Sequence, residues 1–258
     1  MPTRAVLFDL DETLVRDGDA THDALRATAL FAARKGVNTD ELARAAWERA
    51  CAEWDVSPFQ PYFEEMGVSP GECLWGRFIG EDPRLRPMGA WAAHYQLDCW
   101  MHALARQGVT DEMLGATLAE RFRVERRARH DWLFPETRDT LETLAPRYTL
   151  GLVTNGAPDI QRDKLIGSGL EGYFPTVQIS AEARSGKPDP TLILRALEAL
   201  SVAPGDAVMV GDNAARDVLA ANRAGVRAIW IRRGREPSFP GARVDATIAS
   251  LADLAPLL

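Results

Sequence analysis

Two aspartates separated by one residue, Asp9 and Asp11, follow directly after a short apolar run near the start of the chain. In extended backbone the side chains at positions i and i+2 point the same way, so both carboxylates would face one cleft. Two carboxylates about 4 Å apart repel each other by roughly 4 kcal/mol at an effective dielectric constant near 20. The pair therefore requires a bound cation, a shared proton, or both.

Two more segments with suitable chemistry follow later apolar runs. Thr154, Asn155 and Gly156 stand where a strand is expected to give way to a helix, which would leave backbone amides and a hydroxyl for phosphate oxygens. Lys187, one of only three lysines, lies in a G-K-P-D-P turn. Its prolines would fix the turn and aim a compact ammonium group at a phosphate.

The fourth segment, residues 211–217, reads G-D-N-A-A-R-D. Asp212 is suited to complete a cage of hard oxygen ligands for Mg²⁺, and Asp217, about one turn further on, to orient Lys187. Three carboxylates and a phosphate dianion would carry a charge of about −5, which Mg²⁺ and one lysine reduce to about −2. Backbone amides at helix N-termini would have to offset the remainder.

The elements that must position these residues alternate between short apolar strands and helices. Strands are predicted at residues 4–8, 149–153, 176–179, 207–210 and 227–231, and helices at 158–168, 190–200 and 214–224. Gly225 would cap the last helix. This alternation predicts an α/β fold with a doubly wound parallel sheet, in which ligands bind at the carboxyl ends of the strands.

The stretch between the first two strands is different in character. Amphipathic helices are predicted at residues 21–35, 39–53, 90–107 and 111–129, with connections rich in Pro and Gly at 57–61, 67–71 and 81–89. We therefore expect two domains. Residues 1–16 and 132–258 would form the catalytic core, and residues 17–131 an inserted α-helical cap.

The motifs D-L-D-E-T, T-N-G, G-K-P-D-P and G-D-x-x-x-x-D, in this order, resemble those of the haloacid dehalogenase (HAD) superfamily. An insert between the first two motifs resembles subfamily I, which carries a helical C1 cap. The T-N-G sequence resembles the nucleotidase and N-acylneuraminate-9-phosphatase-like branch. The resemblance implies a Rossmann-like core (the HAD fold) and a Mg²⁺-dependent phosphatase, that is, a phosphoric monoester hydrolase.

The resemblance also implies a role for each motif. Asp9 would attack phosphorus and become an aspartyl-phosphate, while Asp11 would protonate the leaving oxygen and then activate water. The substrate phosphate would be held by Thr154, Asn155, Gly156 and Lys187. The metal ligands would be Asp9, the backbone carbonyl of Asp11, and Asp212, with Asp217 behind them.

The implied substrate is a small phosphorylated metabolite, such as a sugar phosphate or a nucleoside monophosphate. A phosphomutase remains an alternative because it shares all four motifs. A haloacid dehalogenase lacks the second aspartate, which is present here as Asp11. A phosphonate hydrolase would need Lys35 to face the cleft. A silent binding protein on this fold would have no chemical need for Asp9, Asp11, Lys187 and Asp212 together.

Composition narrows the class of partner. A net charge of −7 and an isoelectric point near 5.2 argue against binding a nucleic acid polymer. The N-terminal residues resemble neither a signal peptide nor a membrane span, so no membrane association is expected. Three cysteines without metal-binding spacing favour reduced thiols in the cytoplasm. The protein would be a monomer or a homodimer.

The aromatic residues and histidines of the insert carry no motif of their own. Core packing is expected to explain most of these aromatics, with two or three contacting substrate. The aromatics concerned are Trp47, Trp54, Phe59, Tyr62, Phe63, Trp75, Phe78, Trp91, Tyr95 and Trp100. No histidine lies at ligand spacing. The arginine-rich run at 121–129 is interpreted as a solvated helix face.

Overall fold

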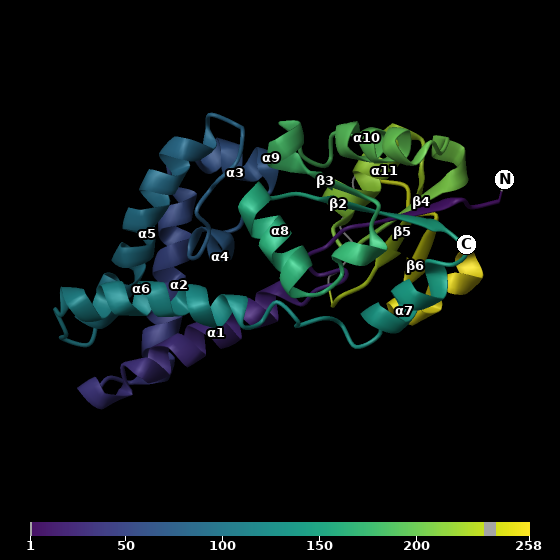
Figure 1. The fold of residues 1–258 in the computed structure, drawn as a ribbon. Coiled ribbons are helices and arrows are strands. Elements are labelled where there is room, and N and C mark those ends of the chain that lie inside the picture. The colour runs from purple at the N-terminus through teal and green to yellow at the C-terminus, as the bar shows by residue number, and fades with distance from the viewer. Residues whose placement is uncertain (1, 235–240) are drawn as a thin grey trace.

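The computed structural model describes residues 2–234 and 241–258. Its core is a parallel sheet in the order β3-β2-β1-β4-β5-β6, with helices on both faces (Figure 1). The strands are β1 (Ala5–Phe8), β2 (Thr149–Thr154), β3 (Thr176–Ile179), β4 (Ala207–Gly211), β5 (Arg227–Ile231) and β6 (Ala246–Ile248). The predicted fold class and the five predicted strands are confirmed. The edge strand β6 was missed because it is short and only one of its residues is buried.

The central strand β1 is an uninterrupted apolar run because it is buried on both faces of the sheet. All four of its residues are buried, since hydrogen-bonded strands lie on either side of it and helices cover both faces. Val6 and Phe8 belong to the apolar cluster on one face of the sheet. Ala5 and Leu7 belong to the cluster on the other face, as the alternation of side chains along a strand requires.

The core helices are α7 (Thr137–Leu144), α8 (Pro158–Gly167), α9 (Ser180–Ala183), α10 (Thr191–Leu200) and α11 (Leu219–Ala224). Short 3₁₀ turns occupy Glu171–Tyr173, Pro204–Asp206, Leu251–Asp253 and Ala255–Leu257. Three of these helices were predicted, although the last begins with a π-helical turn at Ala214–Val218 rather than as regular α-helix. Gly225 ends α11 in the left-handed region, at φ 72°.

The insert between β1 and β2 is helical (Figure 1, purple to teal). It contains α1 (Asp17–Phe31), α2 (Thr39–Asp55), α3 (Gln60–Met66), α4 (Pro70–Cys73), α5 (Leu85–Ala105) and α6 (Glu112–Arg127), with a 3₁₀ turn at Ala33–Lys35. The four long helices were predicted and pack on one another, α1 against α2 and α6, and α5 against the same two. The short α3 and α4 lie partly within stretches expected to be connections. Ser69 starts α4 through a capping box that its side chain forms with Glu72.

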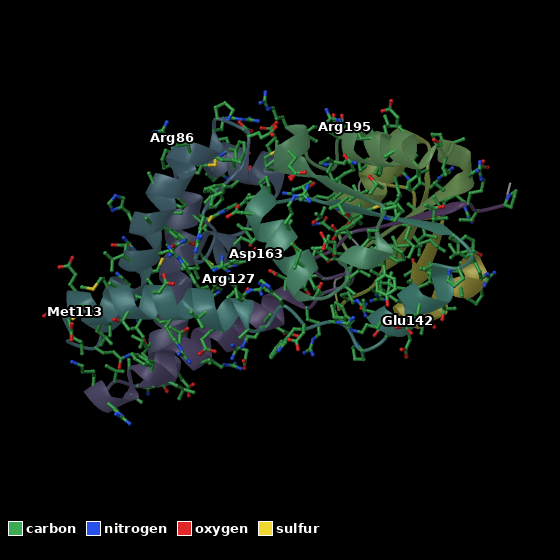
Figure 2. All side chains as sticks on the ribbon, in the orientation of Figure 1. Arg86, Met113, Arg127, Glu142, Asp163 and Arg195 are labelled. Atoms are coloured by element: carbon green, nitrogen blue, oxygen red, sulfur yellow. The ribbon has the colours of Figure 1, made fainter. Side chains whose placement is uncertain are left out.

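The insert and the core touch along α6 and α8. Arg127 on α6 lies beside Asp163 on α8, and the two side chains form an ion pair at 3.0 Å (Figure 2). Among the described residues, no helix combines the length and the apolar character needed to cross a bilayer. Cys51, Cys73 and Cys99 are free thiols.

Candidate active site

The carboxyl ends of three strands meet at one pocket. Phe8 of β1 is in register with Leu152 of β2 and Val210 of β4, and the amide of Asp9 donates to the carbonyl of Val210 at 2.9 Å. The residues that follow these strands therefore open onto the same cavity, which has a volume of about 440 Å³. The predicted residues in its lining are Asp9, Asp11, Thr154, Asn155, Lys187, Asp212 and Asp217.

Gly156 is the predicted phosphate-binding residue that does not line this cavity. Its amide donates to Ser180 Oγ at 2.9 Å, which occupies the donor expected to face a phosphate. Its φ of 141° instead suits the tight turn between β2 and α8.

Lys187 is buried at the end of the pocket that also contains Asp9 and Asp217. Its Nζ lies 2.6 Å from Asp9 Oδ1, 2.7 Å from Asp217 Oδ1 and 2.8 Å from the carbonyl of Val153. Burial alone lowers the pKa of Lys187, but Asp217 and Asp9 outweigh it and the pKa is raised, so the ammonium stays charged. A permanent cation beside Asp9 is suited to hold the oxygens of a transferring phosphoryl group.

Asn155 holds the backbone of the Lys187 turn. The amide of Lys187 donates to Asn155 Oδ1 at 2.8 Å, and Asn155 Nδ2 donates to the carbonyl of Lys187 at 3.0 Å. The Lys187–Pro188 peptide bond is cis. The side chain of Asn155 thus links the end of β2 to the turn that carries the lysine.

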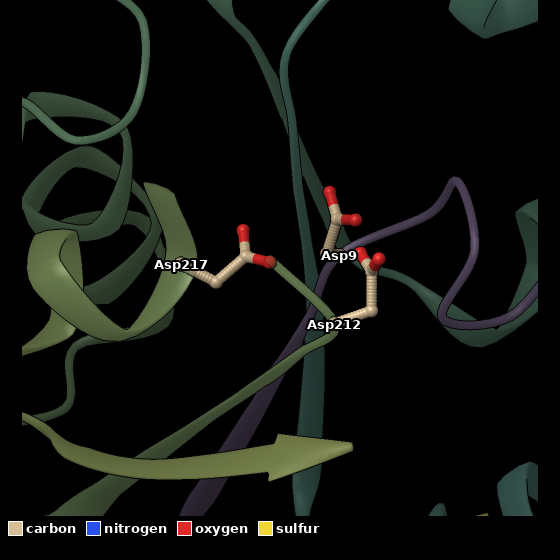
Figure 3. A group of neighbouring side chains, drawn as sticks. All are labelled: Asp9, Asp212 and Asp217. Atoms are coloured by element: carbon tan, nitrogen blue, oxygen red, sulfur yellow. The ribbon is translucent and has the colours of Figure 1, made fainter. Parts of the chain in front are cut away.

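Asp9, Asp212 and Asp217 form a buried carboxylate cluster, with one oxygen of each within 4.8 Å of the others (Figure 3). Burial raises the pKa of Asp9 to about 6, with Lys187 opposing the rise and Asp217 adding to it. Hard oxygen ligands gathered in this way fit a divalent cation such as Mg²⁺. Asp217 already has two partners, because it contacts Lys187 and accepts from the amide of Asn213 at 2.9 Å.

The G-D-x-x-x-x-D spacing has a local steric reason. The π-helical turn at Ala214–Val218 returns the Asp217 carboxylate over the end of β4. A Cβ atom added at Gly211 would lie 2.3 Å from Asp217 Oδ2. Glycine at this position therefore allows the carboxylate to approach the backbone closely.

Asp11 contacts α8, a feature that the motifs did not indicate. Lys164 Nζ lies 3.0 Å from both carboxylate oxygens of Asp11, and Gln161 Nε2 donates to Oδ2 at 3.0 Å. Burial raises the pKa of Asp11 to about 8, with Lys164 opposing the rise and Asp17 and Glu72 among the groups adding to it. A carboxyl group that keeps its proton near neutral pH is suited to donate it to a leaving group.

Sequence analysis assigned no role to Lys164 or Gln161, yet a signal was present. Both residues are buried on the face of α8 that also carries Ile160 and Leu165. A lysine and a glutamine in the apolar stripe of an amphipathic helix indicate a buried polar partner.

The insert supplies the far wall of the cavity. Of its aromatics, Trp47, Trp54 and Phe63 line the part of the pocket that the structure describes. His22 and Arg216 also contribute to the lining. The side chain of Lys35 is 54% exposed and pairs with Asp111 at 3.0 Å, away from the cavity. The structure therefore contradicts the condition for a phosphonate hydrolase, in which Lys35 would face the cleft.

The arginine-rich run differs most from the predicted solvated face at Arg126. Arg126 is 2% exposed and pairs with Asp17, which lines the pocket. Burial raises the pKa of Asp17, but Lys164 and Arg126 outweigh it and bring the pKa to about 2. Asp17 also pairs with Lys164 of α8 at 2.9 Å, so it links the insert to the core.

Comparison with known proteins agrees with this geometry. The family model for haloacid dehalogenase-like hydrolases matches residues 3–225. A phosphoserine phosphatase of Thermus thermophilus is 39% identical over 252 residues, covering 97% of each chain. The N-acylneuraminate-9-phosphatase of Mus musculus is 32% identical over 134 residues, covering 51% of this chain and 54% of its own.

The fold also matches that of solved structures. The magnesium-bound HAD-hydrolase YfnB of Bacillus subtilis superposes with a TM-score of 0.67 at 20% identity, covering 100% of this chain and 99% of that one. Family model, full-length relative and fold agree with the four motifs and with the pocket they form. The chain belongs to the haloacid dehalogenase-like hydrolase family and is a phosphatase, a phosphoric monoester hydrolase, within it.

Proposed function

We propose that the chain hydrolyses a small phosphomonoester in a Mg²⁺-dependent reaction that passes through an aspartyl-phosphate on Asp9. The observation that carries this proposal is the pairing of two unlike carboxyl groups at one pocket. Asp9 lies against the buried ammonium of Lys187, whereas burial raises the pKa of Asp11 to about 8. A nucleophile and a proton donor are thereby distinguished by their surroundings.

In the proposed first step, a carboxylate oxygen of Asp9 forms a bond to phosphorus as the bond to the leaving oxygen breaks. Asp11 gives its proton to that oxygen, and the alcohol departs. In the second step, Asp11 takes a proton from water, the water oxygen attacks phosphorus, and inorganic phosphate and free Asp9 result. Lys187 and Thr154 hold the phosphoryl oxygens throughout.

Asp9, the backbone carbonyl of Asp11, and Asp212 are the proposed ligands of Mg²⁺, with Asp217 orienting Lys187. When bound there, the cation would offset the charge of the carboxylates and of the phosphoryl oxygens. This assignment is supported by the buried carboxylate cluster. Gly156 is proposed only as the residue that shapes the turn, since its amide already has a partner in Ser180.

We propose that residues 17–131 act as the cap that selects the leaving group and excludes water, and that the enzyme is cytoplasmic. Sugar phosphates and nucleoside monophosphates are candidate substrates. A substrate with a second anionic group, such as the phosphoserine hydrolysed by the Thermus relative, is favoured by one observation. Arg216 Nη1 is buried at the pocket without a hydrogen-bond partner among the described residues, and a carboxylate would provide one.

The test is release of inorganic phosphate from sugar phosphates, nucleoside monophosphates, O-phosphoserine and p-nitrophenyl phosphate, with Mg²⁺ or with EDTA. Phosphoethanolamine, which lacks the carboxylate of phosphoserine, isolates the contribution expected from Arg216. Asp9→Asn should keep the fold and lower turnover by roughly 10³-fold or more, because an amide is a far weaker nucleophile. The matched variant Asp19→Asn, whose side chain is 60% exposed, should keep its activity.

Two results would overturn the proposal. One is equal release of phosphate in EDTA and in Mg²⁺, and the other is activity retained by Asp9→Asn. Transfer of the phosphoryl group to a second substrate hydroxyl, without release of phosphate, would instead identify a phosphomutase.

A further inference from the structure

A second buried lysine lies beside the reacting groups, outside all four motifs. Lys164 is 2% exposed, and its Nζ contacts three carboxylates: both oxygens of Asp11 at 3.0 Å, Asp17 Oδ1 at 2.9 Å and Glu72 Oε1 at 2.9 Å. A buried ammonium is costly unless it is well paired, so this arrangement fixes where Lys164 and its partners lie. Lys187 contacts Asp9, the proposed nucleophile, whereas Lys164 contacts Asp11, the proposed acid/base residue.

Gln161 lies one turn before Lys164 on α8 and faces the same group. Its Nε2 is 3.0 Å from Asp11 Oδ2, 2.9 Å from Glu72 Oε1 and 2.8 Å from the carbonyl of Asn155. Both oxygens of Asp11 thus have a donor on one rigid helix. Rotation of the Asp11 carboxyl about its χ angles would cost these contacts.

Glu72 brings the insert into the same network. Its Oε2 accepts from the amide of Ser69 at 2.8 Å within the capping box of α4, and its Oε1 faces Lys164 and Gln161. Ser69 also lines the pocket. Glu72 therefore connects the pocket wall supplied by the insert to the core helix that holds Asp11.

From these contacts we propose that Lys164 and Gln161 are positioning residues that hold Asp11 against the leaving-group oxygen, and that Glu72 completes this arrangement from the insert. The inference rests on the proposed function, because it takes Asp11 as the proton donor. It adds a geometric requirement: side chains of α8, and not only the loop that carries Asp11, fix the orientation of the Asp11 carboxyl group. Glu72 lines the pocket, whereas Lys164 and Gln161 are not in the lining that the structure describes.

The test uses the need of different leaving groups for a proton. p-Nitrophenolate departs readily without protonation, whereas phenolate and p-methoxyphenolate are stronger bases and gain more from an acid. All three aryl phosphates are similar in shape, so each serves as a steric control for the others. The measured quantity is kcat/KM, which reports the step that breaks the bond to the leaving group.

Lys164→Met should lower kcat/KM for phenyl phosphate at least about tenfold more than for p-nitrophenyl phosphate, since misplacing a general acid forfeits part of its roughly 10²- to 10⁴-fold contribution. Asp11→Asn should show the same discrimination, and more strongly. Adding Lys164→Met to Asp11→Asn should bring no further discrimination, because both changes remove one function. Gln161→Met, which removes a donor without removing a charge, should act in the same direction.

Arg162→Met is the matched control. Arg162 is on the same helix but is 48% exposed and pairs with Glu182, so its loss should leave the ratio between the two substrates unchanged. Equal losses on all aryl phosphates in Lys164→Met and in Gln161→Met, or no loss, would overturn the inference. Circular dichroism verifies folding, and Gln161→Met decides the outcome where Lys164→Met does not fold. Failure of the wild-type enzyme to release phosphate would instead contradict the proposed function itself.

Discussion

Different kinds of structure hold the end of the pocket that we propose binds the phosphate (the phosphate end) and the end that we propose binds the leaving group. Asp9, Thr154 and Asp212 lie at or just beyond the ends of hydrogen-bonded strands, so the register of the sheet fixes their backbone. The opposite wall comes from helices of the insert, through side chains such as Trp47 and Phe63. Hydrogen bonding between strands fixes the positions of residues at the phosphate end. The positions of residues in the opposite wall depend on how the insert packs against the core.

The core and the insert also differ in how Lys187 and Lys35 are placed, the first inside the pocket and the second away from it. Lys187, at the phosphate end, is 2% exposed between two carboxylates. Lys35, in the insert, is 54% exposed beside Asp111. A buried cation between two acids is strongly coupled to the fold, whereas an exposed pair contributes little. We therefore expect removal of Lys187 to lower the free energy of unfolding more than removal of Lys35.

Lys187→Met should lower the free energy of unfolding of the metal-free protein by about 3–5 kcal/mol, because Asp9 and Asp217 are left buried without their cation. Lys35→Met should lower it by less than about 1 kcal/mol. Urea denaturation in EDTA near pH 7.5 measures both, and EDTA prevents a divalent cation from replacing the ammonium. Similar losses in the two variants would show that the buried pairing does not anchor this end.

The same difference explains how much was predictable from the sequence. Asp9 and Asp212 directly follow strands, and Lys187 lies in the turn after α9, so short local motifs were enough to predict all three as site residues. Lys164 and Glu72 lie 92 positions apart and meet only through packing of the insert on α8. No local pattern encodes that contact. Only the placement of Lys164 on an apolar helix face hinted at it.

The edge strand and the insert helices that were not predicted from the sequence are short. β6 and α4 are 3 and 4 residues long, too short for hydrophobic periodicity to show. α4 is stabilised by its capping box and by burial of Cys73 rather than by an apolar stripe. Pro70 and Gly71, which suggested a connection, are compatible with the first turn of a helix.

Asp11 lines the pocket and contacts Lys164 on α8. Its burial should make the stability of the folded protein depend on pH. Its pKa is about 8 in the folded protein against a model value of 3.8, so the folded state binds the proton more tightly. Stability from this group is therefore fully present below about pH 4 and is lost as the pH rises through 8. Asp11→Asn, which stays neutral, should raise the melting temperature in EDTA more at pH 8 than at pH 5.

Each kcal/mol relieved corresponds to roughly 2–4 °C in a chain of this size. The control is Asp19→Asn, whose side chain is 60% exposed and which should shift the melting temperature equally at both pH values. If Asp11→Asn changes the melting temperature by the same amount at pH 5 and pH 8, Asp11 does not have a raised pKa. Differential scanning calorimetry in matched buffers gives both shifts.

The smallest expected effect tests the docking of the insert directly. A Cβ atom at Gly186, in the core turn before Lys187, would lie 2.2 Å from the backbone carbonyl of Glu65 in the insert. Gly186→Ala should therefore hold the insert away from the core and raise KM roughly tenfold, about 1.4 kcal/mol, with little change in melting temperature. Gly205→Ala, with no atom within 4 Å of the added carbon, is the control. Asp9 and Lys187 should stay in place, so KM should rise less for p-nitrophenyl phosphate than for substrates that contact the insert. An equal rise in KM for both kinds of substrate would mean that the substitution disturbs the phosphate end instead.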